Sequence, residues 1–363
     1  MNRRVSLRAA VAFSCAFLIG CASAAPAPTR SPSPSPTPAE ASQSPAALPT
    51  ATATPRASLE PTATPDALAA RTQAELHISG GPDFPLEAFG SLWILTPDAD
   101  EPSITRVDPT TNEIVAQIPV GTRLCQAIGA TDDALWACTR GGVIRVDPET
   151  NAVTATVEFP TAEYFGYLPS GEGALWALSG EVTSNNQLVR IDPEGNSVAD
   201  TFALGFDAEW VTYGEGALWL TDKSAGKLWK FDPETESLTE HADGLTEPGQ
   251  SAVGAGSVWL AVHADRDSQP GPNGATILRI DPVTGEIQAE FATGGSMFEG
   301  GIYASDEAVW VRALAPFLAH IDPQTNEIVE TIESNQAGGS VTVAYGSVWA
   351  TSLEFGKVWR LTP

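Results

Sequence analysis

The sequence predicts an all-β fold, a seven-bladed β-propeller, from an internal repeat, short apolar segments between turn residues, and the lack of a long helical pattern. A Trp in a short apolar segment recurs with spacings of 43, 40, 43, 40, 51 and 39 residues, at Trp93, Trp136, Trp176, Trp219, Trp259, Trp310 and Trp349. A period of about 40 residues built from short strands is typical of a four-stranded propeller blade. Propellers host many functions, so function must be argued from departures from the repeat.

The second repeat shows the expected unit most clearly. Strands are expected at 124–128, 134–138, 143–146 and 152–157, with a turn at 130–133 and a second turn from Asp147 to Asn151. Alternating apolar and β-branched residues bounded by Gly, Pro, Asn and Asp favour strands over helices. Each repeat therefore predicts one antiparallel four-stranded sheet.

An Asp-Pro turn recurs before each expected fourth strand, at Asp108, Asp147, Asp192, Asp232, Asp281 and Asp322. Six aligned aspartates could form a calcium-binding array. A hairpin turn explains them more simply, because Pro fixes one dihedral, Asp bonds the backbone ahead, and Asn or Gly tolerates positive φ. We interpret the aspartates as turn residues and the seven Trp residues as packing between blades.

The two ends of the repeat region complement each other. Residues 358–363 match a third strand and the start of its turn, whereas residues 75–81 match a fourth strand. We expect the N-terminal strand to complete the last blade, which would close the ring and leave no exposed sheet edge there.

The N-terminus predicts export. Residues 1–21 combine three arginines with an apolar segment too short to span a membrane, as in a signal peptide. The segment ends in Leu-Ile-Gly-Cys, which resembles a bacterial lipobox and predicts a lipoprotein lipidated at Cys21; an ordinary cleavage near residues 22–24 is the alternative. Residues 22–73 are rich in Pro, Ser, Thr and Ala and predict a disordered tether, which leaves 74–363 as the propeller. We therefore expect a location outside the cytoplasmic membrane, in the cell envelope.

The charge limits the partners. The formal net charge is −26, and all 45 acidic residues follow Cys21, whereas three of the 19 basic residues precede it. Such a surface repels nucleic acid and anionic lipid headgroups. We expect a monomer that binds a protein or a small neutral or cationic ligand, with no cofactor other than a possible divalent cation.

Two cysteines remain in the expected propeller, Cys125 and Cys138. If the hairpin turn is centred between Thr131 and Asp132, the two cysteines lie opposite each other on neighbouring strands. Opposed Cα atoms lie about 4.5–5.5 Å apart, within the reach of a disulfide. We therefore predict one structural disulfide, because disulfides form and persist in exported proteins.

The connections between second and third strands, and those between blades, vary in length and content. They emerge on one face, named here the loop face; the uniform first-to-second and third-to-fourth turns form the opposite turn face. Variable loops at a channel mouth favour binding. The candidate ligand-binding residues on this face are Asp83, Arg123, Gln126, Tyr164, Glu209, Trp210, His263, Glu299 and Arg312.

Two segments of one repeat resemble the YVTN-type and streptogramin B lyase-like (virginiamycin B lyase-like) propeller repeats of bacterial exported proteins. They are Gly-Ser-Val-Trp-Leu at 256–260 and Leu-Arg-Ile-Asp-Pro-Val-Thr-Gly-Glu-Ile at 278–287. The resemblance covers residues 75–363 and implies the propeller fold. Most such domains are similar to binding modules, and the lyase branch implies opening of a cyclic ester by His and Glu with a magnesium ion.

The enzymatic interpretation depends on few residues. The chain has four His, and the register places His77 and His241 on outer strands and His320 on a third strand, so that His263 alone approaches the loop face. Its carboxylate partners would be Glu209 or Glu299. The lyase residues do not map onto matching positions. The sequence therefore favours a lipid-anchored binding propeller without catalytic residues, with a metal-assisted lyase or lactonase as the alternative.

Overall fold

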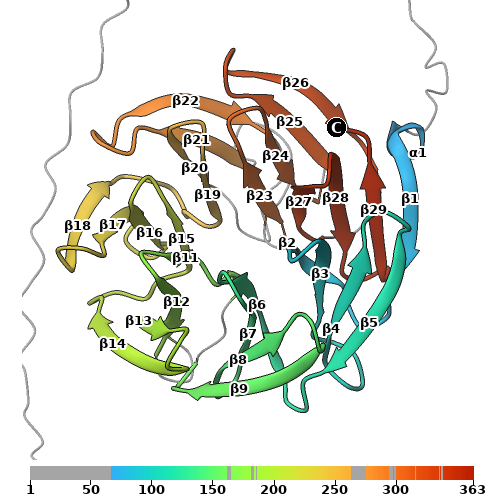
Figure 1. The fold of residues 1–363 in the computed structure, drawn as a ribbon. Helices are drawn as coiled ribbons and strands as arrows, with labels where there is room; N and C mark the ends of the chain where they lie inside the picture. Colours follow the sequence, from blue (N-terminus) through green and yellow to red (C-terminus); the bar gives the residue numbers. More distant parts are fainter. Residues whose placement is uncertain are drawn as a thin grey trace, which may run out of the picture. The chain divides into compact units, whose positions relative to one another are not determined.

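The computed structural model describes residues 67–161, 165–180, 184, 186–262, 275–293, 297, 300–314, 316–334, 336 and 338–363. In this part of the chain the strands form seven sheets arranged as the blades of a ring (Figure 1). The predicted seven-bladed β-propeller is confirmed. Lipidation at Cys21 and most of the expected tether, residues 22–66, lie outside the described residues.

The strands are numbered along the chain, and each blade takes consecutive strands except the last. Blade 1 contains β2 (Asp83–Ala88), β3 (Ser91–Thr96), β4 (Ser103–Asp108) and β5 (Glu113–Pro119), and blade 2 contains β6 (Leu124–Ala130), β7 (Leu135–Thr139), β8 (Gly142–Asp147) and β9 (Ala152–Glu158). Blade 3 has the sheet β11 (Ser170–Gly171), β12 (Ala174–Ser179), β13 (Gln187–Asp192) and β14 (Ser197–Ala203). The short strand β10 (Phe165–Tyr167) leads into the innermost part of blade 3 but pairs with β6, so it extends the sheet of blade 2 to five strands. Blade 4 contains β15 (Trp210–Gly214), β16 (Ala217–Asp222), β17 (Lys227–Asp232) and β18 (Ser237–Ala242). Blade 5 contains β19 (Ser251–Gly254), β20 (Ser257–Val262), β21 (Thr276–Ile280) and β22 (Ile287–Ala292). Blade 6 contains β23 (Gly301–Ala304), β24 (Val309–Arg312), β25 (Leu318–Asp322) and β26 (Glu327–Ile332), and blade 7 contains β27 (Val341–Ala344), β28 (Ser347–Ser352), β29 (Lys357–Leu361) and β1 (Thr72–His77).

The last blade is closed by the start of the described chain, as the sequence predicts. Strand β1 pairs antiparallel with β29, with Glu75 opposite Trp359 and His77 opposite Lys357. The two segments lie side by side in Figure 1. Strand β1 starts at Thr72, before the expected boundary at residue 74, and follows helix α1 (Ala67–Arg71), whose Leu68 packs into the core.

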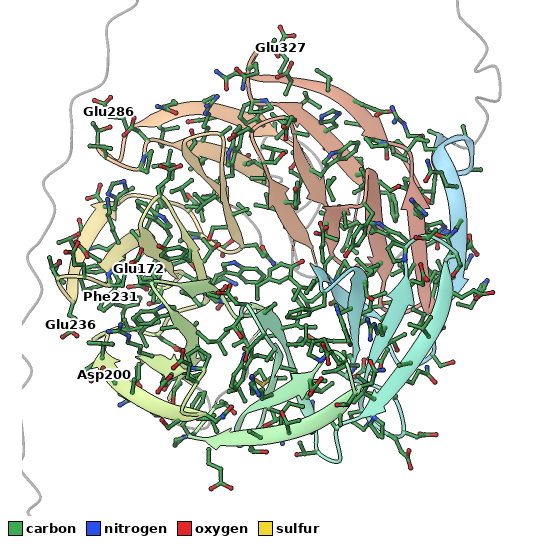
Figure 2. The ribbon with its side chains drawn as sticks, viewed as in Figure 1. Glu172, Asp200, Phe231, Glu236, Glu286 and Glu327 are labelled. Carbon is green, nitrogen blue, oxygen red and sulfur yellow. A yellow bond between two sulfur atoms is a disulfide. The ribbon has the colours of Figure 1, made fainter. Side chains whose placement is uncertain are left out.

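No helix in the described part of the chain is long and apolar enough to cross a membrane. The first strand of each blade lies toward the centre of the ring and the fourth lies at the perimeter (Figure 1). Acidic side chains lie on that perimeter, where Glu236, Glu286 and Glu327 point outward (Figure 2). The strong negative charge of the chain is thus displayed to solvent.

The repeated Trp residues lie in the interior of the blades. All seven are at most 2% exposed. In five blades the indole Nε1 donates to the carbonyl oxygen five residues earlier, at Ala88, Gly171, Gly214, Gly254 and Ala344. Each ring therefore fills the core while satisfying its one polar group, which agrees with a packing role.

In three blades, the Arg of the repeated Arg-Ile/Val-Asp-Pro sequence joins its blade to the next one. In blade 1, the Arg106 guanidinium lies 4.8 Å from the centroid of Trp93. Its Nη1 donates to the carbonyl of Pro148 (2.7 Å) and to Oδ1 of Asn151 (3.0 Å), both in the third-to-fourth turn of blade 2. Its Nε donates to Ser91 at the start of β3. We name this arrangement the Arg clamp; Arg279 and Arg360 repeat it with the turns of blades 6 and 1.

The aspartates of the Asp-Pro turns are occupied by their own backbone. Asp108 Oδ1, for example, accepts hydrogen bonds from the amides of Thr110 and Thr111, which lower the pKa of this carboxyl. The residue closing the turn has positive φ, as at Asn112 (61°) and Asn151 (54°). The hairpin-turn interpretation is confirmed by this geometry.

Candidate functional site

Aromatic side chains from the inner strands of three blades contact one another near the centre of the ring. Phe84 of blade 1 packs edge-on against Tyr167 of blade 3, with ring centroids 5.8 Å apart, and lies 6.4 Å from Trp210 of blade 4. Phe84 and Trp210 are 4% and 5% exposed. Rings from blades 1, 3 and 4 thus meet at the channel and form what we name the aromatic plug.

Local backbone features place these rings. Phe84 has φ of 48° and lies within a register irregularity between Asp83 and Leu86. The Trp210 ring lies over Gly166, where an added Cβ would come within 2.6 Å of the ring. Nε1 of Trp210 donates to the carbonyl of Ser251 in blade 5 (3.1 Å). The plug is therefore anchored to a fourth blade.

A buried polar network lies beside the plug, where blades 6, 7 and 1 meet. Asp83 Oδ1 accepts hydrogen bonds from the Phe84 amide (2.9 Å), from the Ser340 hydroxyl and from the Thr351 hydroxyl (3.3 Å). The guanidinium of Arg312 donates to the carbonyl of Thr351 (3.3 Å), so Thr351 connects the carboxylate with the cation. Three blades are tied together through these groups.

Burial controls the ionisation of both charged members. Desolvation raises the pKa of Asp83 to about 6, opposed by hydrogen bonds from Ser340, Phe84 and Thr351 and by the charge of Arg312. Desolvation lowers the pKa of Arg312 to about 9, opposed by the charge of Asp83. The guanidinium of Arg312 favours the charged form of Asp83, and the carboxylate of Asp83 favours the charged form of Arg312, in a site that is shielded from water.

The structure divides the candidate residues of the loop face into three groups. Arg123 and Glu209 are exposed and Gln126 is half-buried. Asp83, Trp210 and Arg312 are only 5%, 5% and 0% exposed. The expectation that they present their side chains to a ligand is therefore corrected, because Trp210 packs in the aromatic plug and Asp83 and Arg312 bond within the buried network. Tyr164, His263 and Glu299 lie outside the described residues.

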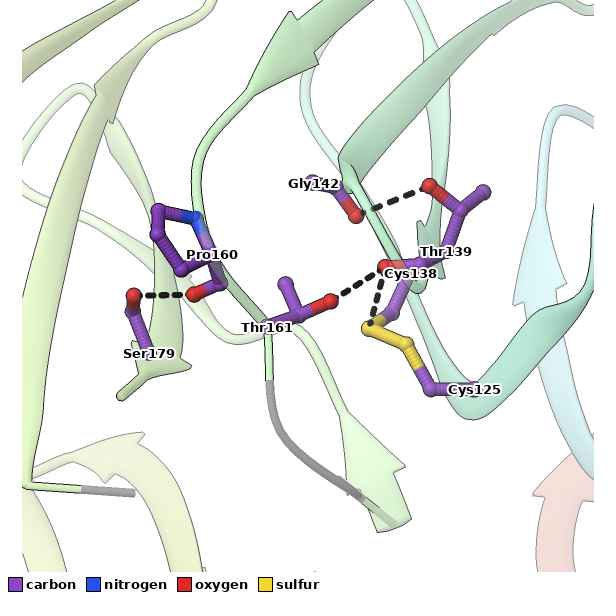
Figure 3. Close-up of a disulfide and its surroundings, with 7 residues drawn as sticks. All are labelled: Cys125, Cys138, Thr139, Gly142, Pro160, Thr161 and Ser179. Carbon is purple, nitrogen blue, oxygen red and sulfur yellow. Dashed lines mark hydrogen bonds between the residues drawn. A yellow bond between two sulfur atoms is a disulfide. The ribbon is translucent and has the colours of Figure 1, made fainter. Parts of the chain in front are cut away.

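The structure joins Cys125 and Cys138 by a disulfide, with Cα atoms 5.2 Å apart (Figure 3). The turn is centred one position later than expected, because Thr131 N bonds Ala134 O and Ala130 pairs with Leu135. An irregularity between Leu124 and Ile128 restores the register that opposes the cysteines. Thr161 donates to the carbonyl of Thr139 (2.6 Å), which fixes the start of the connection to blade 3 beside the disulfide.

Each described histidine lies on a third or fourth strand of a blade. His77 lies exposed on β1, and His241 on β18 packs against Trp219 and bonds the carbonyl of Asp281 (2.9 Å). His320 on β25 stacks on Trp310 at 4.3 Å, in the place that Arg takes in other blades. No group of three or more His, Cys, Asp or Glu in the described residues is arranged to hold a metal ion. The histidine required for the lyase alternative is His263, which the structure does not describe.

Sequence reasoning missed Phe84, Tyr167, Ser340 and Thr351. The candidates Asp83, Gln126 and Glu209 lie ten positions before the Trp of their blade, whereas the plug residues lie nine positions before Trp93, Trp176 and Trp219. Three of seven residues at this position are aromatic, and that enrichment was the available signal.

No protein-family model matches the chain, and no curated protein matches it. Solved structures with a similar fold include a streptogramin B lyase, which is 18% identical with a TM-score of 0.63 over 80% of this chain and 96% of that one. Hydrazine synthase of Kuenenia stuttgartiensis is 11% identical with a TM-score of 0.65 over 80% and 98% of the two chains. BamB from Moraxella catarrhalis is 12% identical with a TM-score of 0.53 over 80% and 99%. At these identities the similarity shows the propeller fold alone.

Proposed function

We propose that this chain is a lipid-anchored, extracytoplasmic binding propeller that presents its loop face to a protein partner. The observation that carries the proposal is the packing of inner strands from several blades: the aromatic plug and the Asp83–Arg312 network hold together the inner strands of blades that carry connections of unequal length. A rigid scaffold carrying variable loops is suited to recognition. The fold similarity to BamB and to streptogramin B lyase is compatible with this role.

The described part of the loop face offers mixed chemistry for a protein interface. Phe355 (51% exposed) and Leu314 (37% exposed) lie in the second-to-third connections of the adjacent blades 7 and 6. Arg123 and Glu209 add exposed charges of both signs. Exposed apolar side chains surrounded by polar ones are typical of interaction sites.

The proposed location rests on the N-terminal signal and on the disulfide. Disulfides persist in oxidising compartments and are rare in the cytosol. Lipidation at Cys21 would hold the propeller at the outer side of the membrane. Replacing Cys21 with Ser should shift the protein from the detergent-rich to the aqueous phase on Triton X-114 partition; unchanged partition would contradict the anchor.

The binding face is tested by a photo-crosslinking amino acid introduced at Phe355 of the full-length chain in living cells. The control site is Val283, which is 83% exposed in the third-to-fourth turn of blade 5 and so belongs to the turn face. We expect a discrete crosslinked species from position 355 and none from 283. Equal crosslinking from both sites, or none from 355, would contradict the proposed face.

The lyase alternative makes a different prediction. A metal that binds only the native state stabilises it by about 2.7 kcal/mol at a hundredfold excess over Kd. A saturable rise in Tm with Mg²⁺, reversed by EDTA and lost in His263→Ala, would favour the metal-assisted enzyme. The binding proposal predicts no such rise.

A further inference from the structure

The Arg clamp is missing between blades 2 and 3, although its parts are present. Four third-to-fourth turns carry Asn at the closing position: Asn112, Asn151, Asn196 and Asn326. In three of them, Oδ1 accepts a hydrogen bond from the Arg of the preceding blade. The Oδ1 of Asn196 is buried and has no hydrogen-bond partner.

The Arg that should reach Asn196 is held elsewhere. Arg145 of blade 2 forms an ion pair with Asp133 of its own blade, and its Nε has no hydrogen-bond partner. The cause is local sequence. In the three clamping blades, Gly-Ser stands where the strand that carries the Trp begins, as at Gly90-Ser91, and the Ser hydroxyl accepts a hydrogen bond from the Nε of the Arg. Blade 2 has Asp133-Ala134 at the matching positions. Asp133 thus supplies a carboxylate and Ala134 removes the hydroxyl.

Blades 2 and 3 are joined instead through their inner strands. Strand β10 pairs parallel with β6, and the Leu168 amide donates to the carbonyl of Ile128 (2.8 Å). The approach is so close that a Cβ on Gly129 would lie 2.0 Å from the carbonyl oxygen of Leu168. On the other side of blade 3, the Tyr213 hydroxyl donates to Glu172 (2.7 Å) and connects the first turn of blade 3 to blade 4.

A cavity of about 770 Å³ lies where the clamp is missing, on the turn face. Its lining residues come from the first turn of blade 2, the first turn of blade 3 and the Asp192-Pro193-Glu194 turn. Asp132, Asp192 and Glu194 form no ion pair among the described residues. Asp192 accepts one backbone amide, from Glu194 (3.0 Å), whereas Asp108 accepts two. The site therefore combines surplus carboxylates with Asp192, Pro193 and Glu194 of the turn that, in three other blades, holds a guanidinium. Asn196 closes the same turn next to this lining.

We propose that this cavity binds the guanidinium of an arginine side chain presented by a partner polypeptide. The chain itself supplies the template: a planar cation at the Pro carbonyl and the Asn Oδ1 of the same turn in blades 1, 2 and 6. The cavity adds Asp132, Asp192 and Glu194, and charge-assisted hydrogen bonds favour Arg over Lys where the geometry is planar. The net charge of −26 attracts a basic partner. This site lies on the face opposite the proposed binding face and is independent of it.

The test is amide chemical-shift mapping on the purified full-length chain, titrated with acetyl-Gly-Arg-Gly-amide. The matching Lys peptide keeps the positive charge without the planar group, and the citrulline peptide keeps the planar group without the charge. Methylguanidine tests whether a small guanidinium compound, and not a polypeptide, is the ligand. We expect saturable shifts at residues 131–133 and 192–196, binding about tenfold weaker for Lys, none for citrulline, and weaker binding of methylguanidine. Equal affinity for Arg and Lys, or shifts elsewhere, would overturn the site; methylguanidine binding as tightly as the peptide would overturn the polypeptide partner.

Matched variants test the residues. Asn196→Gly removes the acceptor while tolerating the positive φ of 49°, and should weaken Arg-peptide binding about fivefold or more. Asn151→Gly and Asn326→Gly remove the same group from occupied clamps and should leave the affinity unchanged. The double variant Asp133→Gly with Ala134→Ser restores the Gly-Ser sequence of the clamping blades. Arg145 should then occupy the site itself, so the Tm should rise and the Arg peptide should no longer bind. Full binding by Asn196→Gly or by this double variant would overturn the proposal.

Discussion

Arg360 donates a hydrogen bond to Oδ1 of Asn112 (3.1 Å), a residue 248 positions earlier in the chain. The same guanidinium bonds the carbonyl of Pro109 and the hydroxyl of Ser347, and it lies 5.3 Å from the centroid of Trp349. This clamp joins blade 7 to blade 1 beside the pairing of β1 with β29. The ring is therefore closed twice, once by a shared sheet and once by a side chain.

Removing the closing clamp should destabilise the propeller. Arg360→Met keeps the apolar stem and loses the bonds of a partly buried cation, so we expect the free energy of unfolding in urea to fall by about 2 kcal/mol. Arg190→Met is the control, because Arg190 stacks on Trp176 but makes no hydrogen bond to the next turn among the described residues. Equal losses in the two variants would show that stacking, not the clamp, stabilises the ring.

The burial of Asp83 predicts a specific pH dependence. Its pKa is raised from 3.8 to about 6, so the folded state holds a proton that the unfolded state has released between these pH values. Stability should therefore fall as pH rises from about 4 to about 6 and stay level above, with a total change of up to about 3 kcal/mol for a shift of roughly two units. Asp83→Asn keeps an oxygen acceptor and removes the titration.

The measurement is urea unfolding of both proteins across this range. The stability of Asp83→Asn relative to wild type should increase from pH 4 to pH 6 and then remain constant. A difference that does not change with pH would show that Asp83 keeps its ordinary pKa in the folded protein.

The sequence was sufficient to predict the blades because their signals are local and repeated. An Asp-Pro turn follows the Trp after 11–16 residues in five repeats, and each copy supports the next. The closing strand was also predictable, since residues 75–81 carry the pattern that residues 358–363 lack. Helix α1 was not predicted, because the apolar contact of Leu68 has no periodic pattern around it.

The centre of the ring could not be predicted in the same way. Alternation along a strand decides which residue faces the channel, and the irregularity after Asp83 shifts it by one position. Phe84 and Trp210 meet across 126 residues of chain, and no local pattern encodes their contact. The Asp83–Arg312 network likewise depends on three blades meeting, so its members were selected as ligand-facing although they are buried.

The disulfide should contribute to stability by an amount that grows with the logarithm of the length of the loop that it closes. Cys125 and Cys138 are 13 residues apart, for which the chain-entropy model gives about 3 kcal/mol. Cys125→Ala with Cys138→Ala should lower the free energy of unfolding by about this amount. A reducing agent should lower the Tm of wild type and leave that of the double variant unchanged; an effect on both would assign the loss to another cause.

The third-to-fourth turn of blade 4 offers a stabilising substitution. Glu236 closes this turn with φ of 55°, a conformation that Asn adopts in four other blades and that costs a residue with a long side chain about 1 kcal/mol. Its side chain points outward (Figure 2), so exchange removes no packing. Glu236→Asn should raise the free energy of unfolding by about 0.5–1 kcal/mol. Glu234→Asn removes the same charge from the same turn at ordinary φ and should have no comparable effect. If both variants gained equally, relief of charge repulsion, and not backbone conformation, would be the cause.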